Sequence, residues 1–186
     1  MKRIFLFSAC VLLAACGGGS ARSGCEQDYW DGTVGTCLPE GWEIIDKETL
    51  RQRGVPEETI VAFQISESVS GQFPTVAVTK ERLPNPVTAQ NYSSASIRSI
   101  EVMEGYTLVD SKDFTVDGED VSLHIFTAQP IEGEPRPRFF QVSTAIEDIG
   151  FTATAVSPVS ITKELEEDMM LILEHLVFSE PIEEEK

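Results

Sequence analysis

The pair Asp117-Gly118 stands between two stretches of alternating apolar and polar residues and is the sharpest turn signal in the chain. Residues 112–116 precede it, and residues 121–125 follow it. Aspartate and glycine both tolerate positive φ, which the commonest two-residue hairpin turns require. The pattern therefore predicts an antiparallel hairpin, which commits this part of the chain to a sheet of sequentially adjacent strands.

Further strand-like runs lie on both sides of this hairpin. Each is short, rich in β-branched or aromatic residues, and bounded by turn-forming residues. Asp148-Ile149-Gly150 is expected to turn the chain between the last two strands, and the three-proline stretch 130–137 is expected to form an exposed loop. The predicted strands cover residues 42–45, 59–66, 74–80, 106–110, 112–116, 121–125, 139–145 and 151–156.

Three segments have helical character. Residues 47–53 predict one or two helical turns, which Gly54 and Pro56 end. Residues 88–103 predict an amphipathic helix with Gly105 as its C-terminal cap. Ser160 is expected to cap a last helix, whose apolar residues recur at core-facing spacing. The two expected buried stripes are Ala89, Tyr92, Ser96, Ile100 and Met103, and Leu165, Met169, Ile172, Leu173 and Leu176.

This order predicts an α+β fold, in which a mainly antiparallel β-sheet has helices packed on its faces. The arrangement resembles the PsbP-like fold, which PsbP proteins, Mog-type proteins and DcrB-like bacterial lipoproteins share. The resemblance spans most of residues 38–178 and implies an α/β/α sandwich with an accessory or binding role and no catalytic residues. It rests on the mid-chain and closing helices and on Leu38-Pro39-Glu40-Gly41-Trp42, Phe73-Pro74-Thr75-Val76-Ala77-Val78, Asp117-Gly118 and Arg138-Phe139-Phe140-Gln141.

The first fifteen residues have the layout of an export signal. Lys2 and Arg3 precede an apolar run of about ten residues, shorter than the roughly 20 that span a bilayer. The run ends in Leu13-Ala14-Ala15-Cys16, which resembles the lipobox of bacterial lipoproteins. The resemblance implies cleavage before Cys16 and acylation of that cysteine with palmitate-like chains. An ordinary signal peptide, with Cys16 incidental, is the alternative.

Residues 16–24 are rich in glycine and serine, which predicts a flexible tether from Cys16 to the domain. In a bacterium with two membranes, the absence of aspartate at position 17 favours the outer membrane by analogy with other lipoproteins. The expected organisation is therefore a signal peptide at 1–15, a tether at 16–24, one globular domain at 25–178 and an acidic tail at 179–186. The protein is expected in the cell envelope, anchored on its extracytoplasmic side.

The charge of the mature chain restricts its partners. Loss of the signal leaves 12 basic residues against 31 acidic ones, a formal net charge of −19. Nucleic acid is excluded as a partner, because phosphate binding depends on clustered lysine and arginine. Anionic headgroups repel such a domain, so its membrane attachment is expected to come from the acyl chains. The expected partner is an envelope protein or a small ligand.

Cys25 and Cys37 remain after Cys10 leaves with the signal and Cys16 is acylated. Thiols of exported proteins oxidise readily, so a disulfide between the two is predicted. Neither cysteine has the neighbours that a tetrahedral zinc site needs, and no metal site is predicted there. The intervening loop carries Tyr29 and Trp30, which are candidate contacts for a protein partner; the alternative is that they plug the edge of the core.

The sequence predicts no catalytic residues and no cofactor. His124 is expected to be a structural residue of a strand, and His175 to cap the last helix. Nucleophile-elbow, zinc-protease and phosphate-loop motifs are absent from the sequence. Two alternatives remain open, a hydrolase or carbohydrate-active enzyme with an unrecognised carboxylate pair, and a divalent-cation binder. The carboxylates concerned are Glu57, Glu58, Asp117, Glu119, Asp120, Glu147, Asp148, Glu164, Glu166, Glu167 and Asp168.

Overall fold

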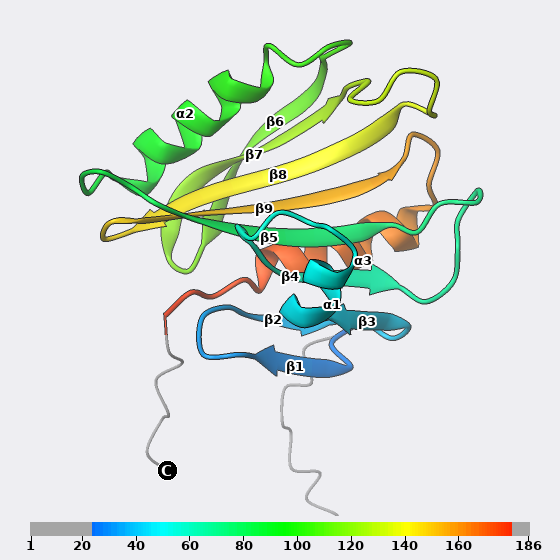
Figure 1. The fold of residues 1–186 in the computed structure, drawn as a ribbon, viewed down its shortest axis with the longest axis horizontal. Coiled ribbons are helices and arrows are strands. Elements are labelled where there is room, and N and C mark those ends of the chain that lie inside the picture. Colours follow the sequence, from blue (N-terminus) through cyan, green and yellow to red (C-terminus); the bar gives the residue numbers. More distant parts are fainter. Residues whose placement is uncertain (1–23, 180–186) are drawn as a thin grey trace, which may run out of the picture.

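The computed structural model describes residues 24–179, which form an antiparallel sheet, a separate hairpin and three helices (Figure 1). The signal peptide, Cys16 and most of the tether and tail lie outside the described residues. The strands are β1 (Gln27–Trp30), β2 (Gly35–Leu38), β3 (Trp42–Ile45), β4 (Thr59–Ile65), β5 (Thr75–Arg82), β6 (Thr107–Val116), β7 (Glu119–Thr127), β8 (Pro137–Ile146) and β9 (Ile149–Pro158). The helices are α1 (Lys47–Gln52), α2 (Ala89–Ile100) and α3 (Lys163–Glu174).

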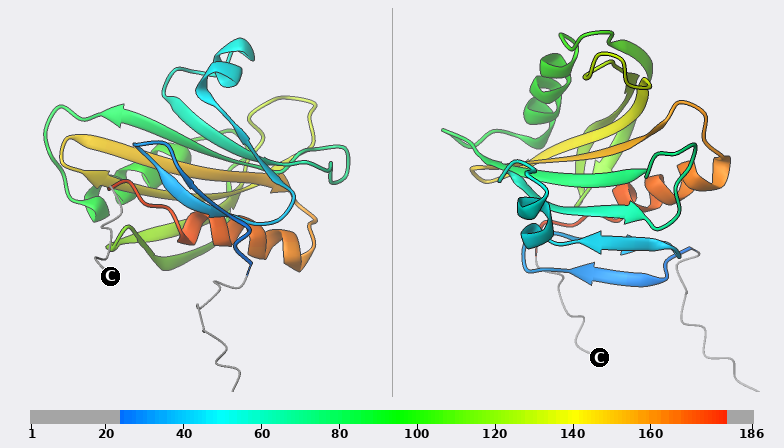
Figure 2. Two further views of the ribbon diagram at one scale, coloured as in Figure 1. Left: turned by 90° about the horizontal axis from the view of Figure 1, so that it is seen from below. Right: turned by 45° about the vertical axis from the view of Figure 1, so that its right-hand side comes forward.

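Seven strands form the main sheet in the order β3-β4-β5-β9-β8-β7-β6, and every pairing is antiparallel. Helices α1 and α3 lie on opposite sides of this sheet, and α2 runs along β7 and β8 (Figures 1 and 2). The expected α+β sandwich is confirmed. None of the helices among residues 24–179 is both long and apolar enough to cross a bilayer.

The main core lies between the sheet and α3. Successive side chains of a strand point to opposite faces, and on β5, β8 and β9 the apolar set points toward this helix. The last-helix stripe predicted from the sequence is buried throughout. Full burial of one such side chain stabilises the fold by about 1.5–3 kcal/mol. The residues of this layer include Val76, Val78, Phe140, Val142, Ala153, Ala155, Leu165, Met169, Ile172, Leu173 and Leu176.

The predicted Asp-Gly hairpin joins β6 to β7. Asp117 and Gly118 have φ of 51° and 81°, the left-handed conformations that this turn needs. The Asp117 carboxylate also accepts hydrogen bonds from the backbone N–H groups of Phe178 (3.1 Å) and Ser179 (3.2 Å). The turn therefore fixes the segment that follows α3. Residues 106–110 and 112–116, expected as two strands, form the single strand β6 with a bulge near Val109.

The segment between the two cysteines was expected to be a loop but is the β1–β2 hairpin. Its second strand is fully buried against α3, where the Thr36 hydroxyl donates to the Ile172 carbonyl (2.6 Å). Gly35 and Val177 exchange backbone hydrogen bonds of 2.8 and 2.9 Å, which tie the hairpin to the segment that follows α3. Four-residue strands of this composition carry little periodic signal, and contacts distant in sequence determine their conformation.

Two expected helix caps and one expected turn were wrong. Helix α2 ends at Ile100 with Glu101 as its cap, and Gly105 lies beyond it in a turn with φ of 66°. Thr162, rather than Ser160, caps α3, because its hydroxyl accepts from the Leu165 N–H (3.3 Å). The turn between β8 and β9 is formed by residues 147–148, and Ile149 and Gly150 belong to β9.

Candidate functional site

A cleft of about 260 Å³ lies at one end of the main sheet. One wall is the β4–β5 connection, and another is the β7–β8 connection, which stands at the upper right of Figure 1. The ends of β8 and β9 form the floor. The lining residues are Gln72, Phe73, Pro74, Pro130, Ile131, Glu134, Pro135, Pro137, Phe139, Val156, Ser157 and Pro158.

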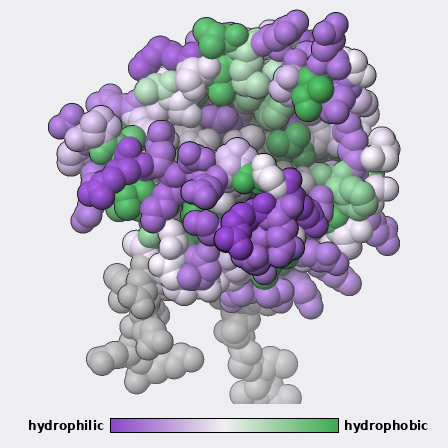
Figure 3. Space-filling model, viewed as in Figure 1, coloured by the Kyte–Doolittle hydropathy of each residue, from purple (hydrophilic) through white to green (hydrophobic). Residues whose placement is uncertain are grey.

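Nine of the twelve lining residues are of apolar types, and five of these are prolines. Proline has a fixed φ and no N–H group, so these residues give the cleft a rigid surface with few donors to satisfy. Phe73 and Ile131, on opposite walls of the cleft, are 50% and 54% exposed. Apolar surface is visible over the β7–β8 connection in Figure 3. Exposed apolar surface of this kind marks binding sites for proteins and ligands.

Hydrogen bonds hold the β7–β8 wall in place. The Gln129 amide donates to the carbonyls of Ile131 (2.9 Å) and Glu134 (2.6 Å). The Arg136 guanidinium donates to the Gly105 carbonyl in the α2–β6 connection. The wall is therefore built before any ligand arrives, which lowers the ordering cost of binding.

A row of aromatic side chains on the α2 face of the sheet ends at Phe139, in the floor of the cleft. Phe139 stacks on Phe126 with ring centroids 4.8 Å apart, and His124 lies 5.6 Å from Phe126. His124 Nε2 is 2.8 Å from the Tyr106 hydroxyl. Its Nδ1 has no hydrogen-bond partner among residues 24–179. His124, expected in a structural role, thus packs against Phe126 on the same face of the sheet as the cleft.

Acidification is expected to weaken the fold through His124. Burial lowers the pKa of this histidine below its ordinary value of 6.5, an effect that the nearby Glu101 carboxylate partly opposes. As pH falls below 6.5, the unfolded chain takes up a proton that the folded chain resists, so the free energy of unfolding decreases. Urea denaturation between pH 8 and 5 should show this slope, and it should flatten in His124→Gln. Replacement of the other histidine (His175→Gln) is the control, and an equal slope in His124→Gln and wild type would contradict the prediction.

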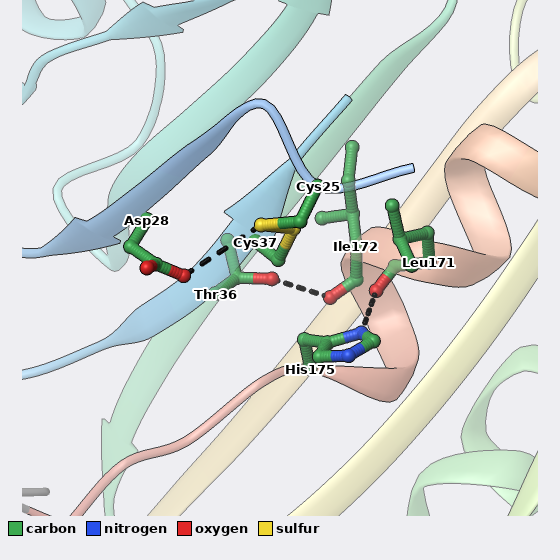
Figure 4. The surroundings of a disulfide bond; sticks show 7 residues. All are labelled: Cys25, Asp28, Thr36, Cys37, Leu171, Ile172 and His175. Atoms are coloured by element: carbon green, nitrogen blue, oxygen red, sulfur yellow. Dashed lines mark hydrogen bonds between the residues drawn. A yellow bond between two sulfur atoms is a disulfide. The ribbon is translucent and has the colours of Figure 1, made fainter. Parts of the chain in front are cut away.

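The predicted disulfide joins Cys25 to Cys37, whose Cα atoms are 5.5 Å apart. Figure 4 shows it beside α3, near the Thr36–Ile172 hydrogen bond. Asp28 Oδ1 lies 3.6 Å from Cys25 Sγ. These three side chains bring their possible ligand atoms together, but the disulfide leaves neither cysteine as a thiolate, the form that binds metals.

The structure separates Tyr29 from Trp30. The Tyr29 ring packs edge-on against buried Phe63, with centroids 5.2 Å apart, so it plugs the edge of the core. Burial, and next the negative charge of Asp31, raise the pKa of the Tyr29 phenol. Trp30 is 36% exposed and lies over Gly35, where an added Cβ would be 2.8 Å from its ring. Partner contact by Trp30 stays a prediction.

Three of the carboxylates singled out in the sequence make structural contacts. Asp148 pairs with Arg82 (3.0 Å), Glu167 with Lys163 (2.6 Å), and Asp117 holds the C-terminal segment. The pKa of Asp168 is raised, chiefly by burial, with a smaller contribution from Glu167.

His175 caps α3, as expected, with Nδ1 2.9 Å from the Leu171 carbonyl.

The cleft itself was missed in the sequence analysis. Its residues come from segments more than 80 positions apart, which only the sheet topology brings together. The density of prolines at 130–137, together with Phe73-Pro74, was the one available signal.

No protein-family model matches the chain, and no curated protein matches it. Solved structures do resemble it. LpqN of Mycobacterium tuberculosis, described as involved in cell envelope biogenesis, aligns with 11% identity and a TM-score of 0.57 over 78% of this chain and 84% of its own. Cyanobacterial PsbP (CyanoP) of Synechocystis sp. PCC 6803 aligns with 12% identity and a TM-score of 0.56 over 87% and 97%. The Ran-binding protein Mog1p of Saccharomyces cerevisiae aligns with 11% identity and a TM-score of 0.50 over 79% and 90%. Together with the antiparallel sheet and its three helices, these alignments show that residues 24–179 adopt a PsbP/Mog1-like α+β fold.

Proposed function

We propose that the chain is a lipid-anchored, extracytoplasmic binding or accessory protein that holds an apolar segment of an envelope protein in the proline-lined cleft. The observation that carries the proposal is the cleft, where Phe73 and Ile131 present half of their surfaces to solvent on rigid, hydrogen-bonded walls. Its lining contains a single carboxylate, Glu134, so no carboxylate pair converges there to serve the hydrolytic alternative.

Three observations support the location. The lipobox-like Leu13-Ala14-Ala15-Cys16 supplies an acylation site, and the Cys25–Cys37 disulfide suits an oxidising compartment. LpqN, which has a similar fold, is described as involved in cell envelope biogenesis. Two or three acyl chains suffice for stable anchoring without help from the acidic domain.

The arrangement of the domain also suits an anchored platform. The described chain begins beside the β1–β2 hairpin, whereas the β7–β8 wall of the cleft stands at the far side of the molecule (Figure 1). A tether of about 8 residues has an r.m.s. reach near 15 Å, so the domain would stay close to the membrane. The cleft would then face away from the headgroups, toward proteins of the envelope space.

Site-specific photocrosslinking in cells tests both parts of the proposal. A photoreactive phenylalanine analogue replaces Phe73 in the cleft or, as the control, Val102, which is 84% exposed outside it. We expect a discrete adduct from position 73 that mass spectrometry identifies as an envelope protein, and no such adduct from position 102. The Cys16→Ser change should move the protein from the membrane pellet to the soluble fraction and abolish the adduct. Membrane retention of Cys16→Ser would refute the lipid anchor at Cys16. Equal adducts from positions 73 and 102 would refute binding of an envelope protein in the cleft.

A further inference from the structure

Strand β6 is the last strand at one edge of the main sheet, and among residues 24–179 it pairs with β7 alone (Figure 1). Seven of its ten residues are exposed, and α2 packs chiefly on β7 and β8 rather than over β6. A long exposed edge strand presents backbone N–H and C=O groups that can pair with a strand of another chain. The β6 edge is therefore a candidate docking surface.

The two-residue turn at 117–118 determines which backbone groups of β6 face outward. The residues that flank such a turn form a hydrogen-bonded pair, and hydrogen-bonded pairs then alternate along the ladder with β7. The backbone groups of Ser111, Asp113 and Thr115 consequently point away from β7. The Ser111 N–H agrees with this direction, because it donates to the side chain of Asp110 (2.9 Å) and not to β7.

Charged side chains on β6 restrict what can pair with this edge. Asp110 and Lys112 form an ion pair of 3.2 Å along the strand, and their side chains are 47% and 60% exposed. Like charges directly opposite each other on neighbouring strands are destabilising, and opposite charges are stabilising. An edge that carries both signs therefore rejects most strands and registers, and favours a strand that presents the opposite charges in the same places.

A second copy of β6 meets this requirement in one antiparallel register. Outward-facing residues must pair with outward-facing residues, so a single residue lies on the twofold axis between the strands. With Asp110, Lys112 or Asp113 on the axis, that residue faces its own copy and like charges repel. With Ser111 on the axis, Asp110 of each copy faces Lys112 of the other, and two ion pairs form.

The same register covers exposed apolar surface. Leu108 and Val109 are 51% and 47% exposed at the start of β6, and pairing about Ser111 brings them beside residues 113–114 of the other copy. We propose that two copies of this chain pair through their β6 edges, antiparallel about Ser111, so that two main sheets join into one. Such a twofold contact is closed and stops at the dimer. The dimer does not depend on the proposed capture of a protein segment in the cleft.

Cysteine crosslinking in intact cells tests this pairing on the full chain. In Ser111→Cys the two new thiols face each other across the axis, where Cα atoms about 5.5 Å apart suit a disulfide. Asp113→Cys is the matched control on the same edge, because its two copies would be four residues out of register, about 13 Å apart. With copper phenanthroline and oxygen as oxidant, we expect a covalent dimer from Ser111→Cys and little from Asp113→Cys on a non-reducing gel. Absence of the dimer, equal dimer from both positions, or a disulfide from position 111 to a different protein would overturn the proposal.

An exchange of charges tests the register. In the Ser111→Cys background, Asp110→Lys and Lys112→Asp each place like charges opposite each other, and each should lower the yield of dimer severalfold. The double variant restores opposite charges with reversed polarity, so it should recover the dimer. Both side chains lie at the surface, so the melting temperature should change little and serves as the check on folding. Unchanged dimer yield in the two single variants, or no recovery in the double variant, would overturn the proposed register.

Discussion

The Gly150→Val variant should unfold with a free energy lower by about 3 kcal/mol, the upper end of the cost of overpacking a well-filled site. Gly150 is on β9, and the Tyr92 ring of α2 lies directly over it. A Cβ added at position 150 would be only 2.6 Å from the Cε2 and Oη atoms of Tyr92. No side chain fits there unless the Tyr92 ring is displaced from its place over β9. The backbone of Gly150 has negative φ, so a β-branched residue at this position would otherwise favour the strand. The clash with Tyr92 is therefore the only reason to expect Gly150→Val to lower the free energy of unfolding.

Urea denaturation measures this effect, and a double-mutant cycle with Tyr92→Ala isolates its cause. In the Tyr92→Ala background the Gly150→Val change should cost far less, because the atoms that it would strike are gone. Gly118→Ala tests glycine loss where an added Cβ would meet no atom within 4 Å. Its expected cost of about 1 kcal/mol comes from positive φ rather than from a clash. Additive effects of Gly150→Val and Tyr92→Ala would contradict the proposed contact.

The parts of the fold that the sequence predicts well are those governed by local rules. Asp117-Gly118 adopts its hairpin because the turn itself demands positive φ. The stripe of α3 is buried because a period near 3.6 leaves its apolar residues on one side of the helix. In both cases the decisive residues lie within a few positions of one another, so no knowledge of the tertiary structure is needed.

The features that the sequence does not predict depend on contacts between distant segments. Strand β2 is ordered by α3, through the Thr36–Ile172 hydrogen bond, and by the bridge between Gly35 and Val177. The role of Gly150 is invisible without Tyr92, 58 positions earlier in the chain. The N-cap of α3 is harder to predict, because serine and threonine are both good caps and either Ser160 or Thr162 could serve. The helix begins at the turn where its apolar stripe first contacts the core.

The cleft and the contact between α2 and the sheet illustrate the same limit for function. Proline at 130–137 predicts an exposed loop, but the sheet order places that loop beside Phe73 and turns it into a wall. Ser96 was expected on the stripe of an amphipathic helix, and its hydroxyl accepts hydrogen bonds from Gln141 and Ser143 of the sheet. A pattern of small residues on a helix predicts close packing, and only the opposing sheet shows that the contact is polar.

Reduction of the Cys25–Cys37 disulfide should lower the free energy of unfolding by about 3 kcal/mol, the value expected when a loop of this length is released in the unfolded chain. Oxidised and reduced wild-type protein have the same side chains, so a comparison of their urea midpoints excludes cavity effects at fully buried Cys37.

A matched variant, Cys25→Ser with Cys37→Ala, should unfold like the reduced protein and no longer respond to reductant.

Hydrogen exchange then shows how the loss of stability is distributed over the domain. The hairpin keeps its bonds from Thr36 to Ile172 and from Gly35 to Val177 without the disulfide, so β2 should remain protected in the folded state. That result would mean that the disulfide stabilises the whole domain by restricting the unfolded chain. Faster exchange confined to β1 and β2 would mean that the disulfide stabilises only the hairpin. Identical midpoints with and without reductant would contradict the prediction itself.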